Sequence, residues 1–217
     1  MSSEIKISYE DNKALMARYP DGYFNLAIVD PPYGIGDTWS KSRKDRFHKK
    51  GKLHSYQNES IPDKAYFDEL FRVSKNQIIW GGNYFTEFLP PTNSWIVWNK
   101  LRDADKTYMS EGEAAWSSFK KVFRIVDFLW DGAKKCEKTV KIHPHQKPVM
   151  LYEWCLMNYA SPGDKILDTH LGSGSIAIAC YNLGFDLTAC ELDLDYYEAT
   201  LKRIENHSLQ KTLRFQL

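Results

Sequence analysis

The stretch KILDTHLGSGSIAIAC, residues 165–180, carries the pattern that decides the fold of this chain. A short apolar run ends in Asp168, a glycine-rich loop follows at 171–175, and an apolar segment continues to about Leu183. Strand, glycine loop and helix in this order are typical of a parallel α/β unit, in which the loop lets the backbone approach a ligand closely. We therefore expect a ligand-binding unit in the last third of the 217-residue sequence.

Apolar runs separated by turn residues extend over the whole sequence. Buried parallel strands are typically short apolar runs, and helices are longer segments with one apolar side. Alternating strands and helices predict an α/β fold with a doubly wound, mostly parallel sheet, formed by a single domain over 1–217. The strands are expected at 24–30, 77–80, 95–98, 113–117, 124–130, 165–168 and 186–190, and the helices at 62–74, 84–89, 148–160, 175–183 and 194–207.

The composition suits a globular chain and argues against several classes of protein. Charged residues make up 26% of the sequence and the net charge is +1, so the chain as a whole is not a polycation. No stretch approaches 18 apolar residues, which argues against a membrane span. The four cysteines show no CxxC spacing. We expect them to be reduced thiols of a cytoplasmic protein.

A second motif, DPPYG at 30–34, directly follows the predicted strand at 24–30. An exocyclic amine on a nucleic-acid base is a poor nucleophile, because its lone pair is delocalised into the ring. Two acceptors on its N–H groups would free the lone pair, and the Asp30 carboxylate and the Pro31 carbonyl can supply them. The prolines stiffen the turn, and Tyr33 can stack on a base that has left the double helix. We therefore expect a catalytic tetrad of Asp30, Pro31, Pro32 and Tyr33; the alternative for the motif alone is a plain proline turn.

The glycine loop by itself allows several cofactors. Gly172, Gly174 and Ala177 have the spacing of a dinucleotide fingerprint, so NAD and FAD fit as well as S-adenosylmethionine. Asp168 precedes the loop, and Glu191 ends the next predicted strand. An acid in the position of Glu191 can accept hydrogen bonds from ribose hydroxyls. Two carboxylates suit the cationic S-adenosylmethionine better than a diphosphate.

The two motifs together resemble a known family. DPPYG precedes LDTHLGSGS (167–175), and this order resembles the β group of amino-DNA methyltransferases, in which the catalytic tetrad precedes the cofactor loop. HPHQKPVMLYEWC (143–155) is similar to the family's motif before the cofactor strand, and IIWGGNYF (78–85) and SWIVWNK (94–100) are similar to its middle-sheet segments. The resemblance covers nearly the whole chain and implies a Rossmann-like fold with permuted motif order.

The resemblance implies transfer of a methyl group from S-adenosylmethionine, leaving S-adenosylhomocysteine, to adenine N6 in DNA, because an aspartate in the position of Asp30 resembles the adenine-specific members. The chain departs from the family at Thr169 and His170, where Pro-Phe is usual, and at His145, where Thr is usual. We expect no metal site at His143 and His145, since a proline separates them in a loop. The residues that the resemblance assigns to the cofactor site are Asp11, His143, Gln146, Lys147, Asp168, Gly172, Ser173, Gly174 and Glu191.

DNA contacts are expected from 37–60, a loop inserted directly after the tetrad. Its segment 41–54 carries seven Lys and Arg residues against one Asp, and 131–142 is a weaker second candidate. A charge run is often only a solvated loop, but this one follows the catalytic motif and is placed to contact phosphates. The cations in question are Lys41, Arg43, Lys44, Arg46, Lys49, Lys50 and Lys52.

Double-stranded DNA is the expected partner, and a homodimer and a cognate restriction endonuclease are further candidates in a prokaryotic or phage setting. A cytosine-N4 DNA methyltransferase and an adenine RNA methyltransferase of the same fold are alternatives. A dinucleotide-dependent oxidoreductase would leave DPPYG unexplained. The intact tetrad argues against a non-catalytic DNA-binding module.

Overall fold

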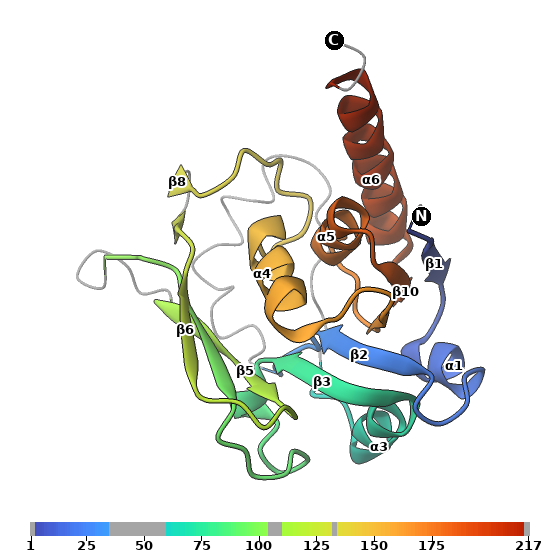
Figure 1. Ribbon diagram of the computed structural model, residues 1–217, viewed down its shortest axis with the longest axis vertical. Coiled ribbons are helices and arrows are strands. Elements are labelled where there is room, and N and C mark those ends of the chain that lie inside the picture. Colours follow the sequence, from blue (N-terminus) through green and yellow to red (C-terminus); the bar gives the residue numbers. More distant parts are fainter. Residues whose placement is uncertain (1–2, 35–59, 104–109, 132–133, 215–217) are drawn as a thin grey trace.

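An eight-stranded sheet with helices on both faces forms the body of the protein (Figure 1). The computed structural model describes residues 3–34, 60–103, 110–131 and 134–214. In sheet order the strands are β1 (Ile5–Tyr9), β10 (Asp186–Glu191), β9 (Lys165–Asp168), β2 (Phe24–Val29), β3 (Ser74–Trp80), β5 (Gly112–Ser117), β4 (Trp95–Asn99) and β6 (Arg124–Asp127).

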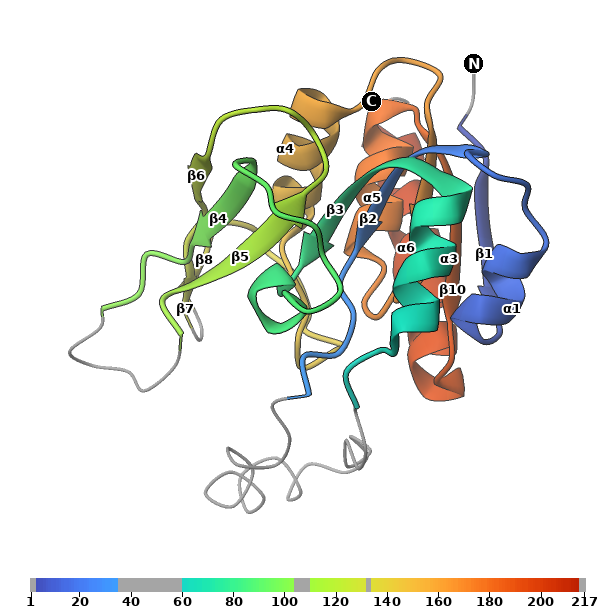
Figure 2. The same cartoon turned by 90° about the horizontal axis from the view of Figure 1, so that it is seen from below.

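Within the described part of the chain, β5 alone runs against the other strands of this sheet. The strands from β1 to β3 pair in parallel, β5 is antiparallel to both its neighbours, and β6 is parallel to β4. Figure 2 shows β4, β5 and β6 at the end of the sheet opposite β1. The predicted doubly wound, mostly parallel sheet is therefore confirmed. A separate two-stranded sheet pairs β7 (Trp130–Asp131) with β8 (Lys134–Lys135).

Local sequence explains where several helices begin and end. The Asp63 carboxylate accepts a hydrogen bond from the backbone N–H of Tyr66 at 2.9 Å and caps α3. Gly174 and Gly184 adopt the left-handed conformation at the two ends of α5. One face of the sheet carries α1 (Asn12–Ala17) and α3 (Lys64–Val73), and the other carries α4 (Val149–Tyr159), α5 (Ser175–Leu183) and α6 (Leu194–Arg214) (Figure 1).

Alternating side chains of β2 supply both layers of the core. Leu26 and Ile28 pack in the cluster that contains α4 and α5, whereas Ala27 and Val29 pack in the cluster that contains α1 and α3. Because successive side chains point to opposite faces, the next position of the first set is Asp30. The alternation thus directs Asp30 to the face on which α4 lies.

Three sequence-based expectations differ from the structure. The predicted helix at 84–89 is wrong: a 3₁₀ turn, η3 (Gly82–Tyr84), is followed by a further turn, because the left-handed Gly81 and the buried Phe85 hold the segment in turns. The predicted strand at 124–130 divides into β6 and β7. Edge strand β1 was not predicted, although its apolar residues Ile5, Ile7 and Tyr9 alternate with polar ones.

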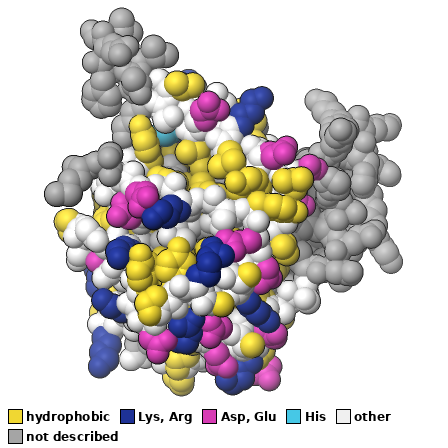
Figure 3. All heavy atoms as spheres, turned by 90° about the vertical axis from the view of Figure 1, so that its right-hand side faces the viewer, with side chains coloured by type: hydrophobic (Ala, Val, Ile, Leu, Met, Phe, Trp, Pro, Cys, Tyr) yellow, Lys and Arg dark blue, Asp and Glu magenta, His cyan; other side chains and the backbone are white. Residues whose placement is uncertain are grey.

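The side of the molecule on which β1 lies carries charges of both signs. Acidic and basic side chains intermingle over the lower part of this side (Figure 3). The pairs Lys6–Glu4 at 2.9 Å and Lys13–Asp63 at 2.7 Å are examples of local neutralisation. Among the described residues, no helix is both long and apolar enough to cross a membrane.

Candidate active site

The carboxyl ends of β2, β9 and β10 meet at one edge of the sheet. β2 and β9 are parallel neighbours, and the chain winds away from them in opposite directions, through α3 to β3 and through α5 to β10. In α/β sheets ligands bind in the crevice at such a switch point. The predicted acids Asp30, Asp168 and Glu191 follow or end these strands, so the fold brings them to the same edge.

Asp30 and Tyr33 contact each other within the tetrad, and the neighbouring Pro31 is buried. The Tyr33 hydroxyl donates a hydrogen bond to Oδ1 of Asp30 at 2.6 Å. The Tyr33 ring stacks on Tyr84 with centroids 5.1 Å apart and planes 15° from parallel. It also lies against Gly81, where a Cβ would come within 2.1 Å of the ring. An aromatic surface beside a carboxylate suits a flat base that carries an amine.

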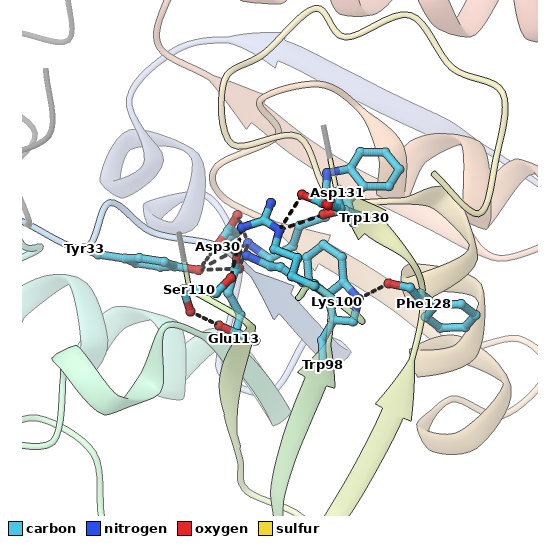
Figure 4. A network of polar contacts seen from close by, with 12 residues as sticks. Asp30, Tyr33, Trp98, Lys100, Ser110, Glu113, Phe128, Trp130 and Asp131 are labelled. Atoms are coloured by element: carbon cyan, nitrogen blue, oxygen red, sulfur yellow. Dashed lines mark hydrogen bonds and ion pairs between the residues drawn. The ribbon is translucent and has the colours of Figure 1, made fainter. Parts of the chain in front are cut away.

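Lys147 joins this group from the segment just before α4. Its ammonium group pairs with Oδ2 of Asp30, lies 2.9 Å from Oε2 of Glu113 and lies 3.2 Å from the Tyr33 hydroxyl oxygen. Lys100, which follows β4, pairs with the other oxygen of Glu113. Figure 4 shows Asp30, Lys100 and Glu113 converging from the ends of β2 and β4 and from β5. The resemblance assigned Lys147 to the cofactor site, whereas the structure brings it to the tetrad.

Charge alternates along Asp30, Lys147, Glu113 and Lys100. Burial by itself would raise the pKa of the Glu113 carboxyl, but the two ammonium groups outweigh it and hold that pKa well below its usual range. Burial would lower the pKa of Lys147, but Asp30 and Glu113 raise it above its usual value. Burial lowers the pKa of Lys100 against the opposing charge of Glu113. Lys147 and Glu113 are therefore an ion pair at neutral pH.

Glu113 and Lys100 are functional candidates near the tetrad that were not predicted from the sequence. Each is a charged residue in or directly after an otherwise apolar strand, GEAAWS for Glu113 and WIVWN for Lys100. The side chain of Lys100 is 8% exposed and that of Glu113 is 21% exposed. A charge next to a buried strand end was the available signal. The sequence alone did not show that Glu113 and Lys100 pair, because their contact depends on the sheet order that places β5 between β3 and β4.

The glycine loop is held in place by α6. Gly174 is left-handed, and a Cβ there would lie 2.4 Å from the methyl group of Thr200. The Thr200 hydroxyl donates to the carbonyl of Gly172 at 2.6 Å, and the Arg203 guanidinium donates to the carbonyl of Ser173 at 2.6 Å. Thr200 and Arg203 were not predicted, because nothing in the sequence of the last helix indicates which of its residues face the loop.

Glu191 closes the loop from the end of β10. Its Oε2 accepts a hydrogen bond from the backbone N–H of Gly172 at 2.7 Å. Its Oε1 accepts from the N–H groups of Leu192 and Asp193, both at 3.0 Å. These bonds fix the carboxylate beside the loop, where its remaining lone pairs can accept from a ribose.

Asp168 provides a test of whether a cationic cofactor fits. Its side chain is buried, accepts a hydrogen bond from the His170 N–H at 3.0 Å, and forms no ion pair with any of the described residues. Burial raises the pKa of Asp168 to about 8. A cation beside this carboxyl would favour its ionised form. S-adenosylmethionine carries an ammonium and a sulfonium group, so Asp168, Glu191 and the loop fit it.

His143 and Gln146 take different places in the segment before α4. The His143 ring packs edge-on against Tyr196 at 4.5 Å, and a Cβ on Gly172 would lie 3.6 Å from it. Burial lowers the pKa of His143 to about 3, so its ring is neutral. Gln146 instead accepts from the N–H of Ile142 at 3.0 Å and shapes its own loop. The structure thus brings His143, and not the Gln146 amide, to the cofactor loop.

Asp11, at the start of α1, and His170, in the loop after β9, lie near each other. Asp11 caps α1 by accepting from the Lys13 N–H at 2.8 Å. His170 lies at the position where the amino-DNA methyltransferases usually have Phe. Its ring packs edge-on against the Tyr66 ring, with the centroids 5.3 Å apart. Its Nε2 lies 3.1 Å from the Asn12 amide nitrogen. His170 therefore occupies an aromatic position while adding polar contacts.

The predicted phosphate contacts at Lys41, Arg43, Lys44, Arg46, Lys49, Lys50 and Lys52 lie outside the described residues. In the second basic segment, Lys135 lies over the Trp130 ring at 4.9 Å in the small sheet of β7 and β8. The direct DNA contacts therefore stay predictions.

Comparison with known proteins identifies the family. A family model for DNA methylases that modify N6 or N4 amino groups matches residues 47–202. The chain belongs to the DNA methylase family. It is thus an S-adenosylmethionine-dependent DNA methyltransferase, and the oxidoreductase alternative is wrong.

Curated relatives of this DNA methylase are type II methyltransferases. It is 23% identical over 222 residues to M.HpaI of Haemophilus parainfluenzae, an alignment that covers 84% of this chain and 68% of the relative. It is 34% identical over 79 residues to M2.DpnII of Streptococcus pneumoniae, covering 36% of this chain and 30% of the relative. The chain therefore matches less than a third of the second relative's length.

Solved structures share the fold of this DNA methylase. The crystal structure of the M1.HpyAVI complex with S-adenosylmethionine superimposes with a TM-score of 0.57 at 20% identity, covering 92% of this chain and 99% of that one. The PvuII DNA methyltransferase, named as cytosine-N4-specific, superimposes with a TM-score of 0.61 at 11% identity, covering 95% and 92%. The fold is therefore shared with a protein named as cytosine-N4-specific, so the fold alone does not determine which base is the target.

Proposed function

We propose that this DNA methylase methylates the exocyclic N6 amine of adenine in double-stranded DNA, on a base flipped out of the helix. The observation that carries the proposal is the Asp30 carboxylate held next to the Tyr33 ring, with the Tyr33 hydroxyl 2.6 Å from Oδ1. A carboxylate is a stronger acceptor for an amine N–H than the serine that cytosine-N4 enzymes usually carry at this position.

The residues have distinct roles in the proposed reaction. Asp30 accepts one N–H of the amine and the Pro31 carbonyl accepts the other, which frees the nitrogen lone pair for attack. Tyr33 stacks on the base and holds it in the pocket. Asp168 and Glu191 would hold S-adenosylmethionine, which would supply a methyl carbon on a sulfonium for transfer to the amine. Asp30 or water takes the proton that the methylated amine loses.

The test uses tritiated S-adenosylmethionine and unmodified genomic DNA, followed by digestion to nucleosides and chromatography. We expect label in N6-methyldeoxyadenosine, and its loss in Asp30→Ala. Glu111→Gln is a matched control, because Glu111 is an exposed acid outside the network. Label in N4-methyldeoxycytidine would overturn the choice of base. Absence of label in DNA would favour an RNA substrate or a non-catalytic binding module.

Further partners belong to the same proposal. The naming of the relatives as type II methyltransferases favours a cognate restriction endonuclease that cuts the same site. Methylated and unmethylated copies of a mapped site, exposed to extracts of the source cell, test this partner. A homodimer also stays a prediction, and light scattering of the purified protein at several concentrations checks it.

A further inference from the structure

Each carboxylate oxygen of Asp30 already has a donor in this structure, although the proposed function requires Asp30 to receive an amine. Its Oδ1 accepts from the Tyr33 hydroxyl at 2.6 Å, and its Oδ2 pairs with the Lys147 ammonium group. The side chain of Lys147 is only 3% exposed, so water cannot replace a lost anionic partner. An incoming amine must therefore compete with these two donors, and a buried ammonium without a partner is costly.

Both donors have a second acceptor within reach, and it is the same atom. Oε2 of Glu113 lies 2.9 Å from the Lys147 ammonium nitrogen and 3.2 Å from the Tyr33 hydroxyl oxygen. The other oxygen of Glu113 pairs with Lys100, which anchors the carboxylate from the far side. Figure 4 shows Glu113 facing Asp30 and Tyr33 from β5. Lys147 and the Tyr33 hydroxyl, which both donate to Asp30, can therefore turn to Glu113 without a large movement.

We propose that Glu113 is a positioning residue that frees Asp30 for the target amine, by taking over Lys147 and the Tyr33 hydroxyl when the base arrives. Lys147 then stays paired and buried, and the Asp30 carboxylate faces the amine without a competing cation. Positive charge develops on the amine during methyl transfer, and an ammonium group still bound to Asp30 would weaken the stabilisation of that charge. The proposal rests on the proposed function only in that the target is an exocyclic amine.

The test measures how much the amine of the target base contributes to DNA affinity, and this measurement needs no methyl transfer. After the methylated base and its site have been mapped, affinities are compared for DNA with the natural base and with the analogue that lacks the amine at that position. The analogue is purine for adenine or pyrimidin-2-one for cytosine. A cytosine result therefore overturns the proposed base but leaves this experiment intact. The ratio of the two dissociation constants reports the contact between Asp30 and the amine.

We expect Glu113→Gln to lower this ratio at least about fivefold, because Lys147 then has only Asp30 as an anionic partner. Glu113→Asp, which keeps the charge, should retain most of the ratio. In a Lys147→Met background, Glu113→Gln should change the ratio less than about twofold, because no ammonium competes for Asp30. Glu111→Gln is the control on the same segment, and cofactor titration checks that each variant is folded.

Two results would overturn the proposal. One is an unchanged ratio in Glu113→Gln. The other is an equal loss of the ratio with and without Lys147, which would mean that Glu113 acts on the fold of the pocket and not through Lys147.

Discussion

Asp168→Asn should stabilise the cofactor-free protein while it impairs cofactor binding. The folded protein holds the pKa of Asp168 at about 8 because of burial, against 3.8 as the ordinary value. A folded-state pKa that is raised means that the native state binds the extra proton, so this carboxyl reduces stability as pH rises from about 4 to 8. An uncharged amide of nearly the same shape removes that cost and can still accept the N–H of His170.

The size of the effect follows from the two pKa values. At pH 7 the carboxyl is almost fully ionised when unfolded but only about one-tenth ionised when folded, which corresponds to a cost of about 4 kcal/mol. A part of this is lost to relaxation around the amide, so we expect Asp168→Asn to raise the free energy of unfolding by about 1–4 kcal/mol at pH 7. The melting temperature should then rise by several degrees.

Thermal unfolding at pH 4, 5.5, 7 and 8, with and without S-adenosylmethionine, tests this reasoning. The advantage of the variant should be near zero at pH 4 and should grow with pH. The cofactor should raise the melting temperature of the unaltered protein more than that of the variant. Glu111→Gln is the control, because the Glu111 side chain is exposed. A variant that is less stable at pH 7, or an advantage that does not depend on pH, would refute the argument.

Other predictions address the remaining parts of the site. Gly81→Ala should lower methyl transfer at least about tenfold, because the added Cβ would meet the Tyr33 ring. Gly163→Ala should keep its activity, because Gly163 also has a positive φ but open space around it. Equal activities in radiolabel assays would contradict this. Arg203→Met should weaken S-adenosylmethionine binding about tenfold in calorimetry, because it loses the contact with the Ser173 carbonyl, and unaltered affinity would count against a supporting role. Neutralising Lys49, Lys50 and Lys52 together should reduce the slope of log affinity for DNA against log salt concentration by about 2.7. An unchanged slope would show that these three lysines do not contact phosphates.

Local patterns were sufficient for most of the strands and for the cofactor loop. KILD, residues 165–168, is a strand because a short apolar run between turn residues has few other stable arrangements in an α/β chain. Gly174 and Gly184 bound α5 because both positions need a positive φ. The helix predicted at 84–89 failed where tertiary contacts override local preference, since the buried Phe85 and the left-handed Gly81 hold that segment in turns.

The sequence by itself determined the class of fold, the order of the tetrad and the glycine loop, and the acids at the strand ends, because these depend on short-range patterns. Only the tertiary structure decided that Lys147, Glu113 and Lys100 surround Asp30. Lys147 lies 117 positions from Asp30 in the sequence, and Glu113 reaches the pair only because β5 inserts between β3 and β4. The physical reason is that a buried charge is stable only beside an opposite charge, and the sheet order, not the local sequence, determines which charges become neighbours.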